Sequence, residues 1–187
     1  VKPLDPAMAT AFRKAVAEAG LGLVVAHDSY LINPASAEDT LHEKSIAGLV
    51  TELERADQLG IPWVVAHPGA AGEQDRAVAV QRAADGIAEA LKRTRNLSSG
   101  ILIETTAGQG SCLGDTFEEI AAMLKRIDRS KTLRDRVAVC LDTCHVFAAG
   151  YPLAPQAALD DTLQQFDAVI GLDRLKLIHA NDSKREC

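Results

Sequence analysis

The sequence lacks the features that mark several large classes of protein. Across its 187 residues, no apolar run approaches the ~18–20 residues that a membrane-spanning helix needs, and the N-terminus has no apolar run of the signal-peptide kind. Four cysteines are not a disulfide framework in a chain of this length, so we expect reduced thiols and a cytoplasmic protein. The sequence therefore predicts no association with a membrane.

An excess of basic residues is also absent. The chain has 20 Lys and Arg against 26 Asp and Glu, which gives a formal net charge of −6. A protein that binds polyanions through one broad basic face is therefore a poor expectation. The full glycine-rich patterns of nucleotide-binding loops, GxGxxG and GxxxxGKS/T, are missing as well, which argues against such a loop here.

What the chain does contain is a regular alternation of strands and amphipathic helices. Five short runs rich in apolar and β-branched residues predict strands near residues 21–26, 61–66, 101–104, 137–142 and 175–179. These runs are continuous rather than alternating, as in strands that are buried on both faces of a parallel sheet. Helix-period apolar stripes fill the segments between the strands, and one more precedes the first strand. Trp63, the single tryptophan, is expected to pack beneath the helices.

The spacing of the strands restricts the fold class. Their starts lie 36 to 40 residues apart, as expected for right-handed βαβ units of a parallel sheet. Eight units of this length would make a TIM (β/α)₈ barrel of about 300 residues. We therefore expect a single α/β domain over residues 1–187, either a small open sheet or an incomplete barrel of about five βα units. The lack of an initiator Met and the abrupt end at Glu-Cys suggest a part of a longer protein.

Every predicted strand finishes with a histidine, glutamate or aspartate at its carboxyl end. These strand-end residues and one neighbour are His27, His67, Glu104, Asp142, His145 and His179. Parallel strands present their carboxyl ends on one side, so these side chains should converge. Desolvating so many polar groups costs several kcal/mol unless something compensates, and metal ions would do so.

The donor atoms and their placement indicate which metals and which chemistry to expect. Imidazole and carboxylate donors suit Zn²⁺, with Mn²⁺ or Fe²⁺ as substitutes. Two ions bridged by one carboxylate form a hydrolytic arrangement suited to phosphoryl displacement. Glu104, on the middle strand, is the expected bridge.

The same residues lie in motifs that occur in order along the chain. The motifs are His27-Asp-Ser-Tyr-Leu-Ile-Asn33, Glu104-Thr-Thr-Ala-Gly-Gln-Gly110, Val139-Cys-Leu-Asp-Thr-Cys-His145 with Phe147-Ala-Ala-Gly-Tyr151, and Ile178-His-Ala-Asn-Asp-Ser-Lys184. Together they resemble the motifs of endonuclease IV, a family of zinc-dependent apurinic/apyrimidinic (AP) endonucleases of DNA base-excision repair. The resemblance runs from about His27 to the last residue.

This resemblance implies a xylose-isomerase-like (β/α)₈ barrel with three zinc ions, and Glu104 as a catalytic residue. The ligand sets that it implies are His27, His67 and Glu104 for the first zinc, Glu104, Asp142 and His179 for the second, and His145 for the third.

The resemblance also implies a substrate and a mode of recognition. The substrate would be duplex DNA that contains an abasic site, cut on the 5′ side of the lesion by a monomeric enzyme. Tyr30 and Leu31 would wedge into the duplex at the lesion and help to flip the abasic nucleotide out.

Two other interpretations stay open on the sequence. Related barrels place His, Glu and Asp on the same strand ends to isomerise or epimerise sugars, and His145 has no obvious use in that chemistry. Alternatively, this chain is an inactive truncated remnant that binds metal or a partner without turnover. Family members carry a further Asp-x-His pair and a Glu that this sequence does not contain.

Overall fold

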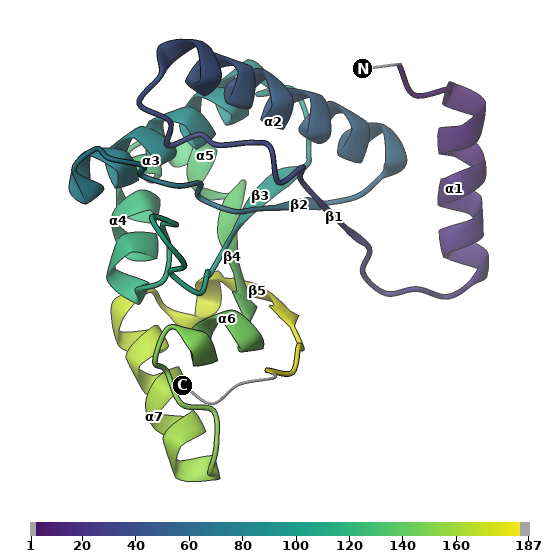
Figure 1. The fold of residues 1–187 in the computed structure, drawn as a ribbon. Coiled ribbons are helices and arrows are strands. Elements are labelled where there is room, and N and C mark those ends of the chain that lie inside the picture. The colour runs from purple at the N-terminus through teal and green to yellow at the C-terminus, as the bar shows by residue number, and fades with distance from the viewer. Residues whose placement is uncertain (1–2, 184–187) are drawn as a thin grey trace.

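The computed structural model describes residues 3–183, in which five strands form one parallel sheet (Figure 1). The strands are β1 (Val25–His27), β2 (Trp63–Ala66), β3 (Gly100–Glu104), β4 (Val137–Asp142) and β5 (Leu175–His179). Their order in the sheet follows the sequence, and each neighbouring pair is parallel. This confirms the α/β class and the wall of a partial barrel. Lys184, which ends the fourth motif, lies outside the described residues.

Helices connect the strands and cover the outer side of the curved sheet. They are α1 (Pro6–Glu18), α2 (Asp39–Leu59), α3 (Arg76–Arg93), α4 (Phe117–Ile127), α5 (Lys131–Arg134), α6 (Thr143–Ala148), α7 (Gln156–Val169) and a 3₁₀ turn at Leu172–Arg174. In Figure 1, α2, α3, α4 and α7 follow one another along this side, and α1 stands beyond the β1 edge. None of the helices described in residues 3–183 is long and apolar enough to cross a membrane.

The three central strands, β2, β3 and β4, bury both of their faces, which explains their continuous apolar character, whereas the edge strands β1 and β5 are less buried and Ile178 of β5 is exposed. On the outer face, strand residues such as Ile101 and Val139 join a large buried cluster with helix residues such as Leu53 and Ile87. On the inner face, a second and smaller cluster forms; its buried members are Val65, Leu102, Ala138 and Cys140. Burying each large apolar side chain stabilises the fold by about 1.5–3 kcal/mol. The sheet is therefore a rigid base for the residues at its carboxyl end.

The first two strands begin later than the sequence predicts. β1 starts at Val25 instead of residue 21, and Leu21 and Leu23 are 57% and 51% exposed. The pairing of β1 with β2 begins at Val25, so the apolar residues before it have no ladder to join. β2 starts after Pro62, which has no N–H to donate to a ladder.

Trp63 lies on the inner face of the sheet, not beneath the helices as the sequence analysis expected. It packs against the inner cluster because it points to the same side of β2 as Val65, two residues on. Gly100, at the start of β3, makes room for the indole. A Cβ on Gly100 would lie 2.5 Å from the indole atom Cζ3 and 2.5 Å from the carbonyl oxygen of Arg136.

We expect the substitution Gly100→Ala to lower the free energy of unfolding by about 1–3 kcal/mol, because the added methyl group overpacks this contact. Gly22→Ala is the matched control, since a Cβ there meets nothing within 4 Å. Its effect should stay within about 0.5 kcal/mol. Urea denaturation of both variants measures the difference, and equal stabilities would contradict the packing described here.

Candidate metal centre

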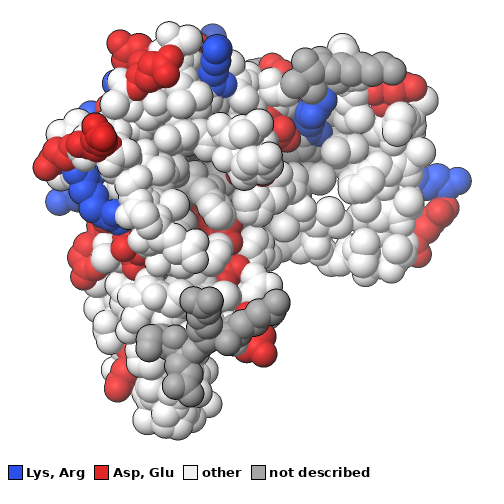
Figure 2. Space-filling model, viewed as in Figure 1, with Lys and Arg blue, Asp and Glu red and all other residues white. Residues whose placement is uncertain are grey.

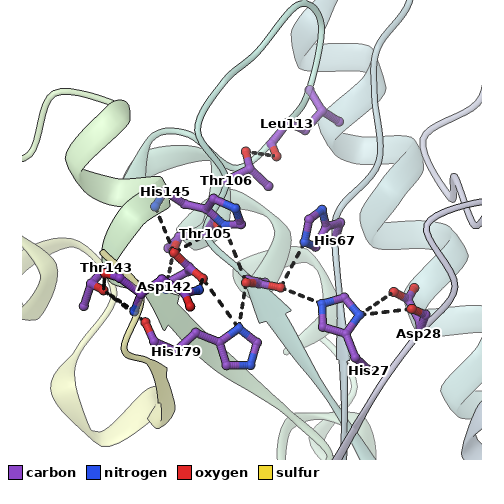
Figure 3. Close-up of polar contacts among 12 residues, drawn as sticks. His27, Asp28, His67, Thr105, Thr106, Leu113, Asp142, Thr143, His145 and His179 are labelled. Carbon is purple, nitrogen blue, oxygen red and sulfur yellow. Dashed lines mark hydrogen bonds and ion pairs between the residues drawn. The ribbon is translucent and has the colours of Figure 1, made fainter. Parts of the chain in front are cut away.

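The carboxyl ends of the five strands bring the predicted metal-binding side chains together (Figure 3). His27, Glu104, Asp142 and His179 end strands β1, β3, β4 and β5, while His67 follows β2 and His145 lies in α6. Three pairs of neighbouring imidazole rings have their centroids 5.4 to 6.0 Å apart. Six residues that come from five successive segments of the chain therefore share one site.

Glu104 occupies the centre of this site, and its side chain is 2% exposed. Its Oε2 atom lies 3.0 Å from Nε2 of His27 and 3.0 Å from Nε2 of His67. Its Oε1 atom lies 2.9 Å from Nδ1 of His179 and 3.5 Å from Nδ1 of His145. Each oxygen faces a different pair of imidazoles, which is the arrangement that a carboxylate needs to bridge two ions.

The imidazoles keep Glu104 ionised. Burial alone would raise its pKa, but hydrogen bonds with His27, His67 and His179 outweigh burial and hold the pKa of Glu104 well below its usual range. Conversely, hydrogen bonds to Asp28 and Glu104 raise the pKa of His27 to about 10. Protonated imidazole is thus one source of positive charge for the buried carboxylate, and a metal ion is the other.

Asp142 links the site to helix α6. Its Oδ1 atom accepts a hydrogen bond from the His145 N–H at 2.9 Å and so caps the N-terminus of that helix. Its Oδ2 atom lies 3.7 Å from Nδ1 of His179 and accepts a hydrogen bond from the side-chain amide of Asn181. One buried carboxylate therefore starts the helix that carries His145 and also faces His179.

Two residues that the sequence analysis missed contact these groups. The carbonyl oxygen of Thr105 lies 2.9 Å from Nδ1 of His145, and the Thr105 hydroxyl accepts the Asp142 N–H at 3.0 Å. The carboxyl group of Asp28 is 3% exposed and lies 3.4 Å from Nδ1 of His27, and burial raises its pKa. The sequence could have identified both residues by their position, because Thr105 and Asp28 each directly follow a predicted ligand at the end of a strand.

The loops after β1, β2 and β3 line a cavity of about 400 Å³ beside His27 and His67. Asn33 ties two of these loops together, because its Oδ1 accepts the Ala70 N–H at 3.1 Å and its Nδ2 donates to the Ala70 carbonyl at 3.2 Å. Tyr30 lines the cavity and is 93% exposed, and Leu31 beside it is 70% exposed. The predicted DNA-contacting pair therefore stands at the cavity rim, open to solvent.

The donor atoms have spacings that suit metal ligands. In three groups, ligand atoms from different residues all lie within 4.8 Å of one another; the groups are His27–His67–Glu104, Glu104–Asp142–His145 and Glu104–Cys140–His179. Separations of 3.0 Å between nitrogen and oxygen suit donors that share one ion at about 2.0–2.2 Å. Burial raises the pKa of the Cys140 thiol to about 12, so its sulfur stays protonated. The nitrogen and oxygen donors fit Zn²⁺, and Mn²⁺ or Fe²⁺ as substitutes.

We expect metal binding at pH 7 to release at least one proton. With its pKa raised to about 10, His27 is protonated at this pH, and a metal ligand must give up that proton. Zinc affinity should therefore rise about tenfold per pH unit above pH 7, whereas a histidine of ordinary pKa would be deprotonated already above about 6.5. Calorimetric titrations between pH 7 and 8.5, in buffers with different ionisation enthalpies, count the released protons. An affinity that does not change over this range would contradict the expectation.

The chain is similar to known proteins over nearly all of its length. A family model described as a xylose isomerase-like TIM barrel matches residues 1–187. The chain belongs to this family. A probable endonuclease 4 from Chloroflexus aurantiacus is 43% identical over 185 residues, which is 99% of this chain and 64% of that protein. Within the xylose isomerase-like family, the resemblance to endonuclease IV inferred from the four motifs is confirmed.

Solved structures share this barrel fold. Endonuclease IV from Thermus thermophilus has a TM-score of 0.81 and 36% identity, covering 99% of this chain and 62% of that one. A D-tagatose 3-epimerase-like protein has a TM-score of 0.74 at 20% identity, covering 95% of this chain and 62% of that one, which shows a shared fold alone. The chain thus spans somewhat less than two thirds of the length of the endonuclease 4 relative and of these two structures.

Proposed function

We propose that this chain contributes to a zinc-dependent AP endonuclease that hydrolyses the phosphodiester 5′ to an abasic site in duplex DNA during base-excision repair. The observation that carries the proposal is the position of Glu104, whose two oxygens face separate pairs of imidazoles at the centre of the site. Similarity to proteins named probable endonuclease 4 supports the choice of reaction. The proposal includes a monomer that acts in the cytoplasm, where thiols such as Cys140 stay reduced.

Under this proposal, the strand-end residues divide among three ions. The first ion would be held by His27, His67 and Glu104, the second by Glu104, Asp142 and His179, and the third by His145 with ligands from elsewhere in the protein. When bound, such ions lower the pKa of a coordinated water and polarise phosphate oxygens.

The residues of this chain would hold the ligands in place and limit what can enter. Glu104 is the catalytic residue of the proposal, and it is buried, so its carboxylate is not solvated by bulk water. The Thr105 carbonyl and the Asp142 carboxylate orient His145. Asn33 fixes the loop that carries Tyr30 and Leu31 against the loop after β2. These two side chains would enter the duplex and help to turn the abasic nucleotide toward the cavity.

The charges on the surface are compatible with binding confined to a lesion. Figure 2 shows Lys and Arg side chains scattered among acidic ones over this face of the molecule, with no single broad basic patch. Metal ions would add positive charge at the strand ends, where the phosphate would bind. We therefore expect weak binding to undamaged duplex and tighter binding at an abasic site.

An incision assay tests the proposal. Full-length protein, purified without chelator and supplied with zinc, should nick a duplex that carries one abasic analogue on the 5′ side of the lesion, leaving a 3′-hydroxyl end. An undamaged duplex of the same sequence is the control. Epimerisation of a ketose without incision would favour the sugar-epimerase alternative. Zinc binding with neither activity would favour a remnant without turnover.

We expect Tyr30→Ala to weaken binding to abasic DNA about tenfold while leaving zinc content unchanged. Aromatic stacking on a base contributes about 1–3 kcal/mol, and Tyr30 is 93% exposed, so little packing within the protein is lost. Met8→Ala, on the exposed side of α1, is the matched control and should bind as the parent does. Fluorescence anisotropy and elemental analysis measure the two quantities. A loss of zinc in Tyr30→Ala would instead assign this loop to the metal site.

A further inference from the structure

The carboxyl group of Asp28 is buried beside the site, although it belongs to none of the three donor groups. Its side chain is only 3% exposed. Its backbone N–H donates to the Val65 carbonyl at 2.9 Å, so Asp28 continues the pairing between β1 and β2 by one residue. This backbone pairing holds the carboxyl group in place next to His27.

The imidazole of His27 lies between two carboxylates (Figure 3). Its Nε2 atom is 3.0 Å from Oε2 of Glu104, on the side of the site. Its Nδ1 atom is 3.4 Å from Oδ1 of Asp28 and 3.0 Å from the Asp28 carbonyl oxygen. Both acceptors at Nδ1 come from Asp28, so a hydrogen on Nδ1 is directed to that residue. Metal-binding histidines are commonly held in this way, with the second ring nitrogen donating to a carboxylate or a carbonyl.

The second carboxylate oxygen of Asp28 shows that packing alone does not explain this residue. Oδ2 is buried and has no hydrogen-bond partner among residues 3–183. A buried carboxylate oxygen without a donor costs stability, and such a group in a folded protein calls for an explanation. A carboxylate acceptor makes an imidazole a more basic ligand than a carbonyl does.

We propose that Asp28 is a positioning residue for the metal site: it fixes the ring of His27 with the hydrogen on Nδ1, so that Nε2 is presented to an ion shared with His67 and Glu104. In this role Asp28 contacts neither the ion nor the substrate. The inference rests on the metal site of the proposed function, and it is independent of the substrate and the reaction.

Zinc affinity of the full-length protein, measured by competition with a chromogenic chelator, tests the role of Asp28. Asp28→Ala should weaken zinc binding by about 10–100-fold, the range found when such orienting partners are removed. Asp28→Asn keeps an acceptor without the charge and should weaken binding about 5–10-fold. Asp57→Asn is the matched control, because the Asp57 carboxylate accepts the Ser98 N–H at 2.8 Å before the start of β3, away from the site. Its zinc affinity should stay within about twofold of the parent.

Nitrogen-15 NMR of the zinc-loaded protein adds a second measurement, the Nδ1 resonance of His27. This resonance would not change if Asp28 had only a structural role. The parent should show His27 protonated at Nδ1, with the resonance assigned by its loss in His27→Gln. This resonance should shift or broaden in Asp28→Ala and stay unchanged in Asp57→Asn. If Asp28→Ala does not fold, Asp28→Asn is judged by the same two measurements.

The outcomes separate this inference from the proposed function. Folded Asp28 variants with parental zinc affinity and an unchanged Nδ1 resonance would overturn the role of Asp28. A parent that binds zinc with the expected dependence on Asp28 and leaves abasic DNA intact would refute the nuclease and keep the role of Asp28. A parent that binds no zinc would overturn both.

Discussion

Glu104→Ala is expected to remove at least two metal ions and to lower the rate of incision at an abasic site by about 10³-fold or more. Both oxygens of Glu104 face imidazoles that would share its ions, so the substitution takes a donor from two ions at once. The electrostatic contribution of bound ions to such a reaction is several kcal/mol, and each 1.4 kcal/mol is a factor of ten in rate. Elemental analysis and single-turnover incision measure the two losses.

Two further variants make the Glu104 result specific. Glu104→Gln keeps the size of the side chain and one oxygen, so it separates the loss of charge from the loss of volume. Glu118→Ala removes an exposed glutamate on α4 and should leave metal content and rate unchanged. Incision retained by a folded Glu104→Ala protein would show that this carboxylate does not bridge the ions.

Removal of the metal ions is the second large effect that we expect. Treatment with a chelator should abolish incision, and zinc added in excess should restore it. When the free concentration of an ion is about 1,000 times its dissociation constant, its binding stabilises the folded state by about 4 kcal/mol. At about 2–4 °C per kcal/mol, loss of one tightly bound ion should lower Tm by about 10 °C. Elemental analysis verifies that the ions have gone, and incision by protein shown to be metal-free would refute the metal-dependent mechanism.

Without ions, the stability of the protein should depend on pH in a direction that the pKa shifts define. The pKa of Glu104 is lowered on folding, so its contribution is present above about 4.5 and is lost as the pH falls. The pKa of His27 is raised to about 10, so its contribution is complete below about 6.5 and is lost as the pH rises toward 10. The chelated protein is therefore expected to be most stable between about pH 4.5 and about pH 6.5, where both contributions are present.

Much of this architecture could be predicted from the sequence because it depends on local patterns. Continuous apolar runs at regular spacing identify the strands, and one topology rule brings their carboxyl ends to the same side. β4 and β5 have the predicted bounds, and β3 differs by one residue. The juxtaposition of the histidines with Glu104 and Asp142 follows from the same rule and needs no knowledge of side-chain packing.

The features that were missed depend on neighbours that are far away in the sequence. The start of β1 is determined by where β2 can pair with it, and the apolar residues from Leu21 onward give no sign of this. Asp28 follows His27 at the start of a loop, so its burial could not be anticipated from its own surroundings. For Trp63 the information was present, since every second residue of a strand faces the same side, and His67 lies four residues further on.

The distance along the chain between Glu104 and its partners has a consequence for how the protein matures. His27 and His179 are 77 and 75 residues away from it, and each neighbouring ligand comes from a different parallel strand that is reached only through a helical crossover. The two ions that Glu104 would bridge therefore cannot be captured by a short local segment that then guides the rest, as happens in zinc fingers. The sheet must first close these long loops on the strength of its apolar contacts, so binding of these two ions is expected to follow chain collapse.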